Sequence, residues 1–226
     1  MIYEKKHINI LCIAMVEDRT NLDKQIQKQT IQPDRVVFYE DKKPAVGIEN
    51  RRKRIAENHK KLKAIVRAYK PDLVWQVEGD GDYPPDCLEK LVRRFHELYD
   101  WTFGYVSGIQ VGRHGLYHIG AWRNFTKDSF ESIDHTLEGL HEVQATGFYC
   151  LLTTPEIWLS GKCEWTDEPY GPDVVWGLSI RGRKFVDMDI KIGHIIKGGI
   201  IRPEHASTTT VRFKKKGDKW EYEQLK

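Results

Sequence analysis

The chain has 226 residues, of which 40% are hydrophobic, so it can bury one sizeable core, and one domain is the default expectation for this length. Its 36 basic residues nearly balance 33 acidic ones, and a net charge of +3 does not mark a nucleic-acid-binding protein by bulk charge. No apolar stretch approaches the roughly 20 residues of a membrane helix, so no membrane span is expected. The four cysteines form no CxxC pair, which favours reduced core thiols in a cytoplasmic protein.

The N-terminal half alternates between short apolar runs and helical patterns. The expected elements are a strand at 8–15, a helix at 20–29, a strand at 35–40, a helix at 48–69, a strand at 73–77 and a helix after the prolines at 84–85. This alternation predicts parallel strands with helices on both faces of a sheet. Ligands of such sheets bind outside the carboxyl ends of the strands.

The C-terminal half predicts longer strands broken by glycine, at 101–112, 116–123 and 142–154. Between them the polar stretch 124–139 is expected to be a loop or a short helix. A compact helix at 172–184 and one or two short strands at 184–196 follow. We expect one domain over residues 1–199 and a basic, partly mobile tail over 200–226.

Three acids, Glu78, Asp80 and Asp82, lie together where the strand at 73–77 ends. Like charges so close repel each other, and a bound cation is the commonest reason to gather them. The plain alternative is a turn, because Asp-Gly is a strong turn dipeptide. The position at a strand end favours a site for a metal ion or a diphosphate, with Mg²⁺ or Mn²⁺ as the expected ion.

The segments "VEGDGDYPPDCLEKL" (77–91), "ATGFYCLLTTPEIW" (145–158), "YGPDVVWGLSIRGRKFV" (170–186) and "IKIGHI" (190–195) occur in this order. They resemble, respectively, the DxD segment, the glycine-bearing strand beneath the donor sugar, the Glu-Asp helix and the histidine-ending strand of metal-dependent glycosyltransferases with the GT-A fold. The closest resemblance is to the large family 2 group of these enzymes. It covers roughly residues 8–196, and the ordered set is more specific than any one motif.

The resemblance implies an α/β, GT-A-type, Rossmann-like mixed sheet flanked by helices in a single domain. It implies transfer of a sugar from a nucleotide sugar, with UDP-sugars favoured, to a hydroxyl of a saccharide or other acceptor. Asp82 is the implied direct metal ligand, and Asp80 is either a ligand or the partner of the ribose. His194 is a third implied ligand, and its imidazole would favour Mn²⁺ over Mg²⁺. Gly147 corresponds to the glycine beneath the donor sugar.

Two further residues are implied donor contacts. Arg51, in the basic run of the helix at 48–69, would meet the diphosphate or the base, although a charge run is usually a solvated helix face. Asp41 would accept a hydrogen bond from an N–H of the base, although it also fits a solvent-facing turn. The chain departs from the family pattern here, because Glu40-Asp41-Lys42-Lys43 stands where the family has Asp-Asp-Gly-Ser.

Asp173 is the predicted general base of an inverting transfer. It follows Pro172, which replaces the first acid of the family's Glu-Asp pair, and Glu168 or Asp167 could substitute for it. A base at this position would remove the proton from the acceptor hydroxyl. The start of a helix favours an ionised carboxylate, which is also the plain structural reason to find Asp there.

Three other functions fit parts of the pattern. A sugar nucleotidyltransferase would share the acidic metal site, but the loop after the first strand, "AMVEDRTN", lacks the glycines that bind a triphosphate. A non-catalytic binding module would keep the pocket without the base. The same chemistry on a nucleic-acid acceptor would use the basic helix and the "RFKKK" tail.

Overall fold

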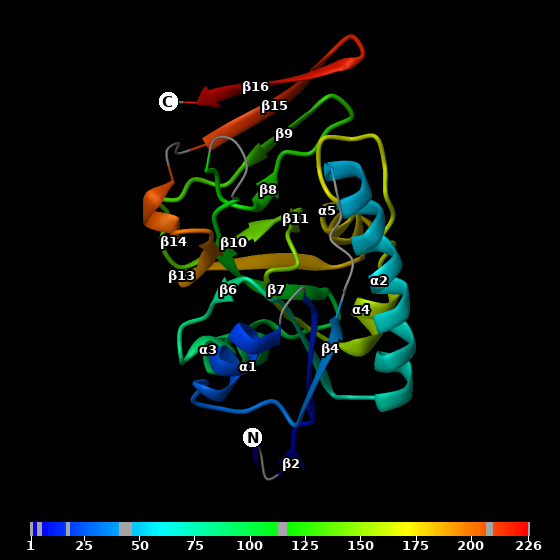
Figure 1. The fold of residues 1–226 in the computed structure, drawn as a ribbon, viewed down its shortest axis with the longest axis vertical. Helices are drawn as coiled ribbons and strands as arrows, with labels where there is room; N and C mark the ends of the chain where they lie inside the picture. Colours follow the sequence, from blue (N-terminus) through cyan, green and yellow to red (C-terminus); the bar gives the residue numbers. More distant parts are fainter. Residues whose placement is uncertain are drawn as a thin grey trace.

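The computed structural model describes residues 2–3, 6–16, 19–40, 47–112, 117–206 and 210–225. One large mixed sheet forms its centre, and a second sheet lies above it in Figure 1. The helices of the described ranges are α1 (Arg19–Gln27), α2 (Ile48–Tyr69), α3 (Cys87–Leu98), α4 (Pro155–Ser160), α5 (Pro172–Ser179) and the 3₁₀ turn η1 (Pro203–His205). In this part of the chain every helix is too short or too polar to span a bilayer.

The central sheet has the strand order β10-β13-β7-β12-β5-β3-β4, and β6 and β14 pair with β13 outside this path. Its strands are β3 (Ile10–Val16), β4 (Arg35–Glu40), β5 (Leu73–Glu78), β6 (Gly81–Asp82), β7 (Phe103–Gln110), β10 (Leu140–Val143), β12 (Cys150–Thr153), β13 (Arg183–Ile196) and β14 (Gly199–Ile201). The second sheet, in the order β11-β8-β9-β15-β16, contains β8 (Ala121–Arg123), β9 (Ser129–Ser132), β11 (Ala145–Thr146), β15 (Thr210–Lys216) and β16 (Lys219–Leu225). Strands β1 (Ile2–Tyr3) and β2 (Lys6–His7) form a separate antiparallel pair.

The N-terminal half confirms the predicted parallel arrangement. Strand β3 pairs in parallel with both β4 and β5. It is buried from Ile10 to Ala14 because helices cover both faces of the sheet there. Buried side chains of α1 and α3 pack on one face, and those of α2, α4 and α5 pack on the other (Figure 1). The predicted α/β fold, a mixed sheet flanked by helices, is therefore confirmed, and the carboxyl ends of these strands share one edge.

The segment 142–154, predicted as a long strand broken by glycine, is divided between the two sheets. Strand β10 pairs with β13, β11 pairs with β8 in the second sheet, and β12 returns to the central sheet between β5 and β7. The chain leaves the second sheet at Gly147. Residue preference indicates strand character, but the choice of sheet depends on the neighbours that each face meets.

Other predictions for the C-terminal half are corrected. Residues 129–132, within the stretch predicted as a loop or short helix, form β9, because Phe130 fills a hydrophobic cluster that only the folded chain creates. The helix predicted at 172–184 ends at Ser179, and 183–196 form one long strand. In the predicted tail, residues 200–206 contain the end of β14 and η1, and residues 210–225 form the β15–β16 hairpin, which pairs with β9. The separation of 200–226 from the domain and its partial mobility stay predictions.

Strand β13 joins the parts of the central sheet. Its first part pairs with β10 and, in parallel, with β7. The register then shifts between Val186 and Lys191, and the last part pairs with β6 and β14. A Cβ on Gly108 of β7 would lie 2.7 Å from the carbonyl oxygen of Ile190, so only glycine allows this close approach. The irregularity redirects the end of β13 to the edge where β5 ends.

An ion pair holds the irregular part of β13 against α3. The Asp187 side chain, 2% exposed, accepts a hydrogen bond from Nε of Arg94 at 2.7 Å and another from the backbone N–H of Asp189 at 3.0 Å. Asp187→Ala would remove the buried half of this pair, although Arg94 keeps Glu97 as a second partner at 2.8 Å, and breaking buried pairs costs about 3–5 kcal/mol. Because Arg94 is 23% exposed, we expect the low end, a loss of about 3 kcal/mol in the free energy of unfolding measured by denaturant titration.

The control for this variant is Glu142→Ala. It removes an ion pair with Arg183 in which both side chains are 53% exposed, and it should change the free energy of unfolding by less than about 1 kcal/mol. Equal losses in the two variants would mean that the Asp187 pair contributes no more than a surface pair.

Candidate functional site

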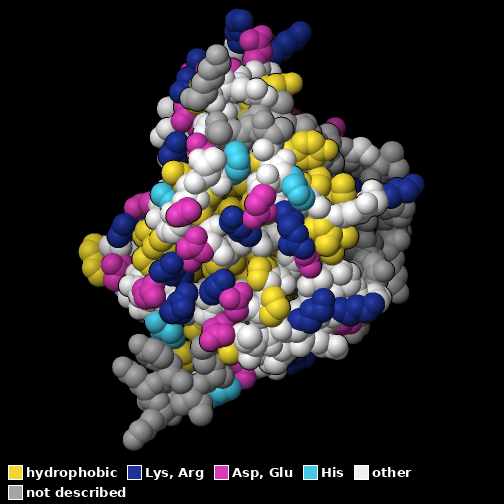
Figure 2. Space-filling view, turned by 90° about the vertical axis from the view of Figure 1, so that its left-hand side faces the viewer, with side chains coloured by type: hydrophobic (Ala, Val, Ile, Leu, Met, Phe, Trp, Pro, Cys, Tyr) yellow, Lys and Arg dark blue, Asp and Glu magenta, His cyan; other side chains and the backbone are white. Residues whose placement is uncertain are grey.

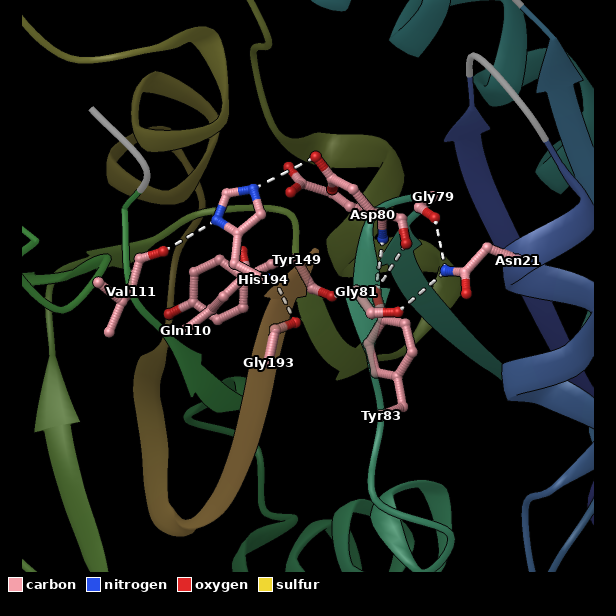
Figure 3. A network of polar contacts seen from close by, with 11 residues as sticks. Asn21, Gly79, Asp80, Gly81, Tyr83, Gln110, Val111, Tyr149, Gly193 and His194 are labelled. Carbon is pink, nitrogen blue, oxygen red and sulfur yellow. Dashed lines mark hydrogen bonds and ion pairs between the residues drawn. The ribbon is translucent and has the colours of Figure 1, made fainter. Parts of the chain in front are cut away.

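A tight acidic turn follows β5 at the carboxyl edge of the sheet. The side-chain amide of Asn21, on α1, donates to the carbonyl oxygens of Gly79 at 3.2 Å and Gly81 at 3.4 Å (Figure 3). The backbone N–H of Glu78 donates to the Tyr83 hydroxyl at 2.9 Å. The single hydrogen of that hydroxyl can be donated to the carbonyl oxygen of Glu78, which is also 2.9 Å away. Hydrogen bonds from Asn21 on α1 and from Tyr83 therefore hold the turn and fix the positions of its acids.

Pairing between β6 and β13 brings the end of the chain's long strand to this turn. Gly81 lies opposite His194, Asp82 lies opposite Gly193, and the N–H of Ile195 donates to the carbonyl oxygen of Asp80 at 2.8 Å. A Cβ on Gly193 would lie 3.0 Å from the Cβ of Asp82, so glycine lets the two short segments meet. Two regions that are distant in sequence thus form one site.

The imidazole of His194 lies between a backbone carbonyl and a carboxylate. Its Nδ1 is 2.9 Å from the carbonyl oxygen of Val111, and its Nε2 is 3.2 Å from Oδ2 of Asp80 (Figure 3). A carbonyl oxygen only accepts, so Nδ1 carries a hydrogen and Nε2 faces the acids. Burial opposes protonation of the ring, but the hydrogen bond and charge of Asp80 and the carbonyl of Val111 raise the pKa of His194 above its ordinary value.

Asp82 lies beside this pair but points its carboxylate at an arginine. Nη2 of Arg202, just after β14, donates to Oδ2 of Asp82 at 2.6 Å. In the described ranges no three His, Cys, Asp or Glu side chains converge closely enough to hold a metal ion. The donors nevertheless fit Mn²⁺ chemically, because a carbonyl on Nδ1 directs Nε2 of His194 outward, as in most metal-binding histidines. The Arg202 pair is half-exposed, so Asp82 can exchange it for another cation.

Asp173 lies in the first turn of α5, after Gly171 and Pro172. Burial raises the pKa of its carboxyl above the ordinary value, although backbone N–H groups of Val174 and Phe148 and the charge of Arg52 act in the opposite direction. The sequence predicted that the helix start would favour the ionised form. Backbone N–H groups at the helix start do lower the pKa, as predicted, but burial acts against them and has the larger effect.

Tyr149 links the acidic turn to Asp173. Its carbonyl oxygen accepts a hydrogen bond from the Tyr83 hydroxyl at 2.8 Å. A Cβ placed on Gly147 would lie 2.7 Å from the ring of Tyr149 and 3.2 Å from Oδ2 of Asp173. Gly147 therefore packs closely against the ring and the carboxylate, and a larger residue would not fit there without a shift of its neighbours.

The predicted site residues have different outcomes. Asp80 and His194 are brought into direct contact, and Asp82 is adjacent through the strand pairing. Gly147 and Asp173 are brought together as well. The half-buried Arg51 lies at the start of α2, where its role stays a prediction, and Asp41 lies outside the described residues.

Three residues of the site were missed by the sequence-based predictions. Asn21 and Tyr149 hold backbone segments, and Arg202 pairs with Asp82. Arg52, which follows Arg51 in the basic run of α2, donates to the carbonyl oxygens of residues 168 and 169 and so fixes the loop before α5. These contacts join residues that are far apart in the sequence, so local patterns do not predict them. The basic run that contains Arg52 was the one signal visible in the sequence.

No protein-family model matches the chain, and no curated protein matches it in sequence. The fold is similar to that of solved structures, among them the following two. The structure of A197 from STIV has a TM-score of 0.57 and 15% identity, over 88% of this chain and 92% of that one. The structure of GalNAc-T7 with UDP, GalNAc and Mn²⁺ has a TM-score of 0.50 and 12% identity, over 86% of this chain and 45% of that one. The chain thus spans less than half of the GalNAc-T7 chain.

These likenesses, at low identity, concern the fold alone. Together with the sheet order they define the class: the chain has a GT-A-like, Rossmann-type α/β fold. The acidic turn and the end of β13 lie at the ligand-binding edge of that fold.

The close packing around Gly147 can be tested by adding a methyl group there. In Gly147→Ala the new methyl group would overlap the Tyr149 ring, which is 4% exposed and held by a hydrogen bond from its hydroxyl to Gly120. Overpacking of this kind costs about 1–3 kcal/mol, and we expect that loss in thermal unfolding.

The matched control is Gly199→Ala, because among the described residues nothing lies within 4 Å of a Cβ at that position. Its midpoint should stay near that of the original chain. A Gly147 variant that is equally stable would contradict the tight arrangement of ring and carboxylate.

Proposed function

We propose that the protein is a metal-dependent glycosyltransferase that moves a sugar from a nucleotide sugar, with UDP-sugars favoured, to an acceptor hydroxyl. The contact between Asp80 and His194 at the carboxyl edge of the sheet carries this proposal, because it joins two separately predicted ligands. The GT-A-like fold supports it, since the similar GalNAc-T7 structure contains UDP, GalNAc and Mn²⁺.

The proposed metal ligands are Asp80, Asp82 and His194. Their carboxylate oxygens and imidazole nitrogen suit Mn²⁺ better than Mg²⁺. When bound, the ion would neutralise charge on the diphosphate as the sugar departs. The chain's own contribution is to fix these ligands through the β6–β13 pairing and to supply Arg202 as a second positive charge beside Asp82.

The proposed base is Asp173, and the transfer inverts the anomeric carbon. The carboxylate takes the proton from the acceptor hydroxyl, and the acceptor oxygen forms a bond to the anomeric carbon. The bond from that carbon to the diphosphate breaks, and its electron pair leaves with the nucleoside diphosphate. Gly147 lies beneath the donor sugar, while Arg51 and Asp41 meet the diphosphate and base. A cytoplasmic location is part of the proposal and agrees with the four free, buried cysteines.

The first test measures metal-dependent donor binding. We expect UDP-sugars to raise the melting temperature only with Mn²⁺, since a ligand at 100 times its Kd stabilises by about 2.7 kcal/mol. Asp82→Ala and His194→Ala should each weaken Mn²⁺-dependent UDP binding at least tenfold by calorimetry. His141→Ala is the control, because that histidine, on β10, bonds to the carbonyl oxygen of Glu138.

Two outcomes would count against this part of the proposal. Unchanged UDP and Mn²⁺ binding in either ligand variant removes that residue from the metal site. Absence of stabilisation by every nucleotide sugar, with and without Mn²⁺, removes the donor itself.

The second test concerns the base. Asp173→Asn keeps the side-chain shape but cannot accept a proton, so turnover should fall by about 10²–10⁴ while donor binding persists. Because the pKa of Asp173 is raised, the carboxyl is protonated and inactive at pH values below that raised pKa. The acid limb of the kcat/KM profile should therefore lie above the ordinary Asp value and be absent in Asp173→Asn. If turnover of Asp173→Asn stays within a few-fold of that of the original chain, Asp173 is not the base and only stabilises the start of α5.

A further inference from the structure

The two faces of the second sheet carry different side chains. Phe213 lies opposite both Phe130 and Tyr222, and Trp220 lies opposite Lys215. Directly paired residues, and residues two positions apart, share a face, so these five side chains lie on one side of the sheet. The rings of Phe130 and Phe213 stack with centroids 4.7 Å apart, and the Trp220 ring is 5.5 Å from Phe130. We call this side the aromatic face.

The aromatic face is covered at one end and open at the other. Near β11, α5 packs on it, and Phe130 is 2% exposed. Toward the hairpin, Phe213 and Trp220 are half-buried and Tyr222 is 61% exposed. Exposure rises strand by strand, so the described part of the chain leaves the hairpin end open. Exposed aromatic clusters of this kind mark binding surfaces.

The charges of the hairpin lie mainly on the opposite face and neutralise one another. Arg212 pairs with Glu131 at 2.5 Å and with Glu223 at 3.1 Å, and Lys214 also pairs with Glu223 at 3.1 Å. Figure 2 shows basic and acidic side chains intermixed along one side of the molecule, including its hairpin end. A nucleic-acid site needs a one-signed basic surface for phosphates. The charges therefore favour an occupant without a phosphate backbone.

The aromatic face is continuous with the candidate site. Tyr170 lies three residues before Asp173, and its ring is 5.4 Å from Phe130 and 5.6 Å from Phe125. At the inner edge of the sheet, β11 ends immediately before Gly147. A molecule that presents a hydroxyl to Asp173 can therefore extend along this face toward the hairpin.

We propose that the aromatic face binds a saccharide chain that carries the acceptor hydroxyl, with its sugar rings stacked on Tyr170, Phe213, Trp220 and Tyr222. The inference rests on the proposed function, because it supplies the acceptor for that reaction. One side of a pyranose ring presents C–H groups that pack on an aromatic π-face, while its hydroxyls stay in water. The occupant is thus a neutral oligosaccharide or polysaccharide.

Two polar side chains on the aromatic face can form hydrogen bonds with a saccharide. Gln224 lies opposite Val211, and so shares the side of Trp220 and Tyr222. The Nζ of Lys215 lies 5.9 Å from the Trp220 ring centroid. An amide and an ammonium group beside flat rings can donate hydrogen bonds to sugar hydroxyls.

The test is binding of the full chain to an array of immobilised linear oligosaccharides of hexoses and N-acetylhexosamines, with single-stranded oligothymidylate on the same surface. We expect retention on longer oligosaccharides of at least one class. Tyr222→Ala and Trp220→Ala should each weaken that retention about tenfold, the effect of losing one stacked ring. Tyr222 is exposed, so this variant should fold even if Trp220→Ala does not. Trp101→Ala, at a residue 95% exposed between α3 and β7, is the control and should bind like the original chain.

Each outcome decides the proposal. The proposal is overturned if Tyr222→Ala leaves retention unchanged or if no oligosaccharide retains the chain. It is also overturned if only oligothymidylate retains the chain in a salt-sensitive way, because the face then binds nucleic acid. Mn²⁺-dependent UDP binding of the original chain is measured in parallel. If UDP binds and no saccharide does, the acceptor surface is wrong and the proposed function stands. If a saccharide binds through Tyr222 and UDP does not, the surface stands and the proposed transfer reaction falls.

Discussion

The pairing of β6 with β13 is the constraint on which the site depends. It is a short contact, in which Gly81 and Asp82 meet His194 and Gly193, yet it joins segments that are more than a hundred residues apart. Strand β13 reaches this contact after a register shift between Val186 and Lys191, and its pairing with β7 continues to Ile192, immediately before the contact begins.

Burial sets the electrostatics of the two halves of the site in different ways. At His194 a carboxylate and a carbonyl overcome burial and raise the pKa of the ring. At Asp173 burial outweighs several N–H groups and a nearby arginine and raises the pKa of the carboxyl. The difference arises because an ion stays charged in the interior only where partners of opposite charge outweigh its lost hydration. The pKa therefore rises at both groups, at His194 because of its partners and at Asp173 because of burial.

In the proposed reaction, the central sheet would bind the donor and the second sheet the acceptor. The central sheet is closed on both faces by helices, so it offers only its carboxyl edge, which suits a compact, highly charged donor. The second sheet is closed by α5 at one end only, so it offers an open face, which suits an extended partner. Asp173 lies between them, because α5 packs on the aromatic face while its first turn reaches Gly147.

The sequence by itself determined the parallel strands β3, β4 and β5, because continuous apolar runs between amphipathic helices have few other ways to be buried. It also placed the acids of the turn at the end of β5, since that strand end is visible in the local pattern, whereas His194 was implied only by the family resemblance. Only the tertiary structure decided that Asp80 contacts His194 and that Asp82 pairs with Arg202. It alone revealed β9 and the pairing of the β15–β16 hairpin, because short half-exposed strands leave almost no periodicity. The direction of the Asp173 pKa likewise needed the whole fold, since burial is a property of the surroundings and not of the residue.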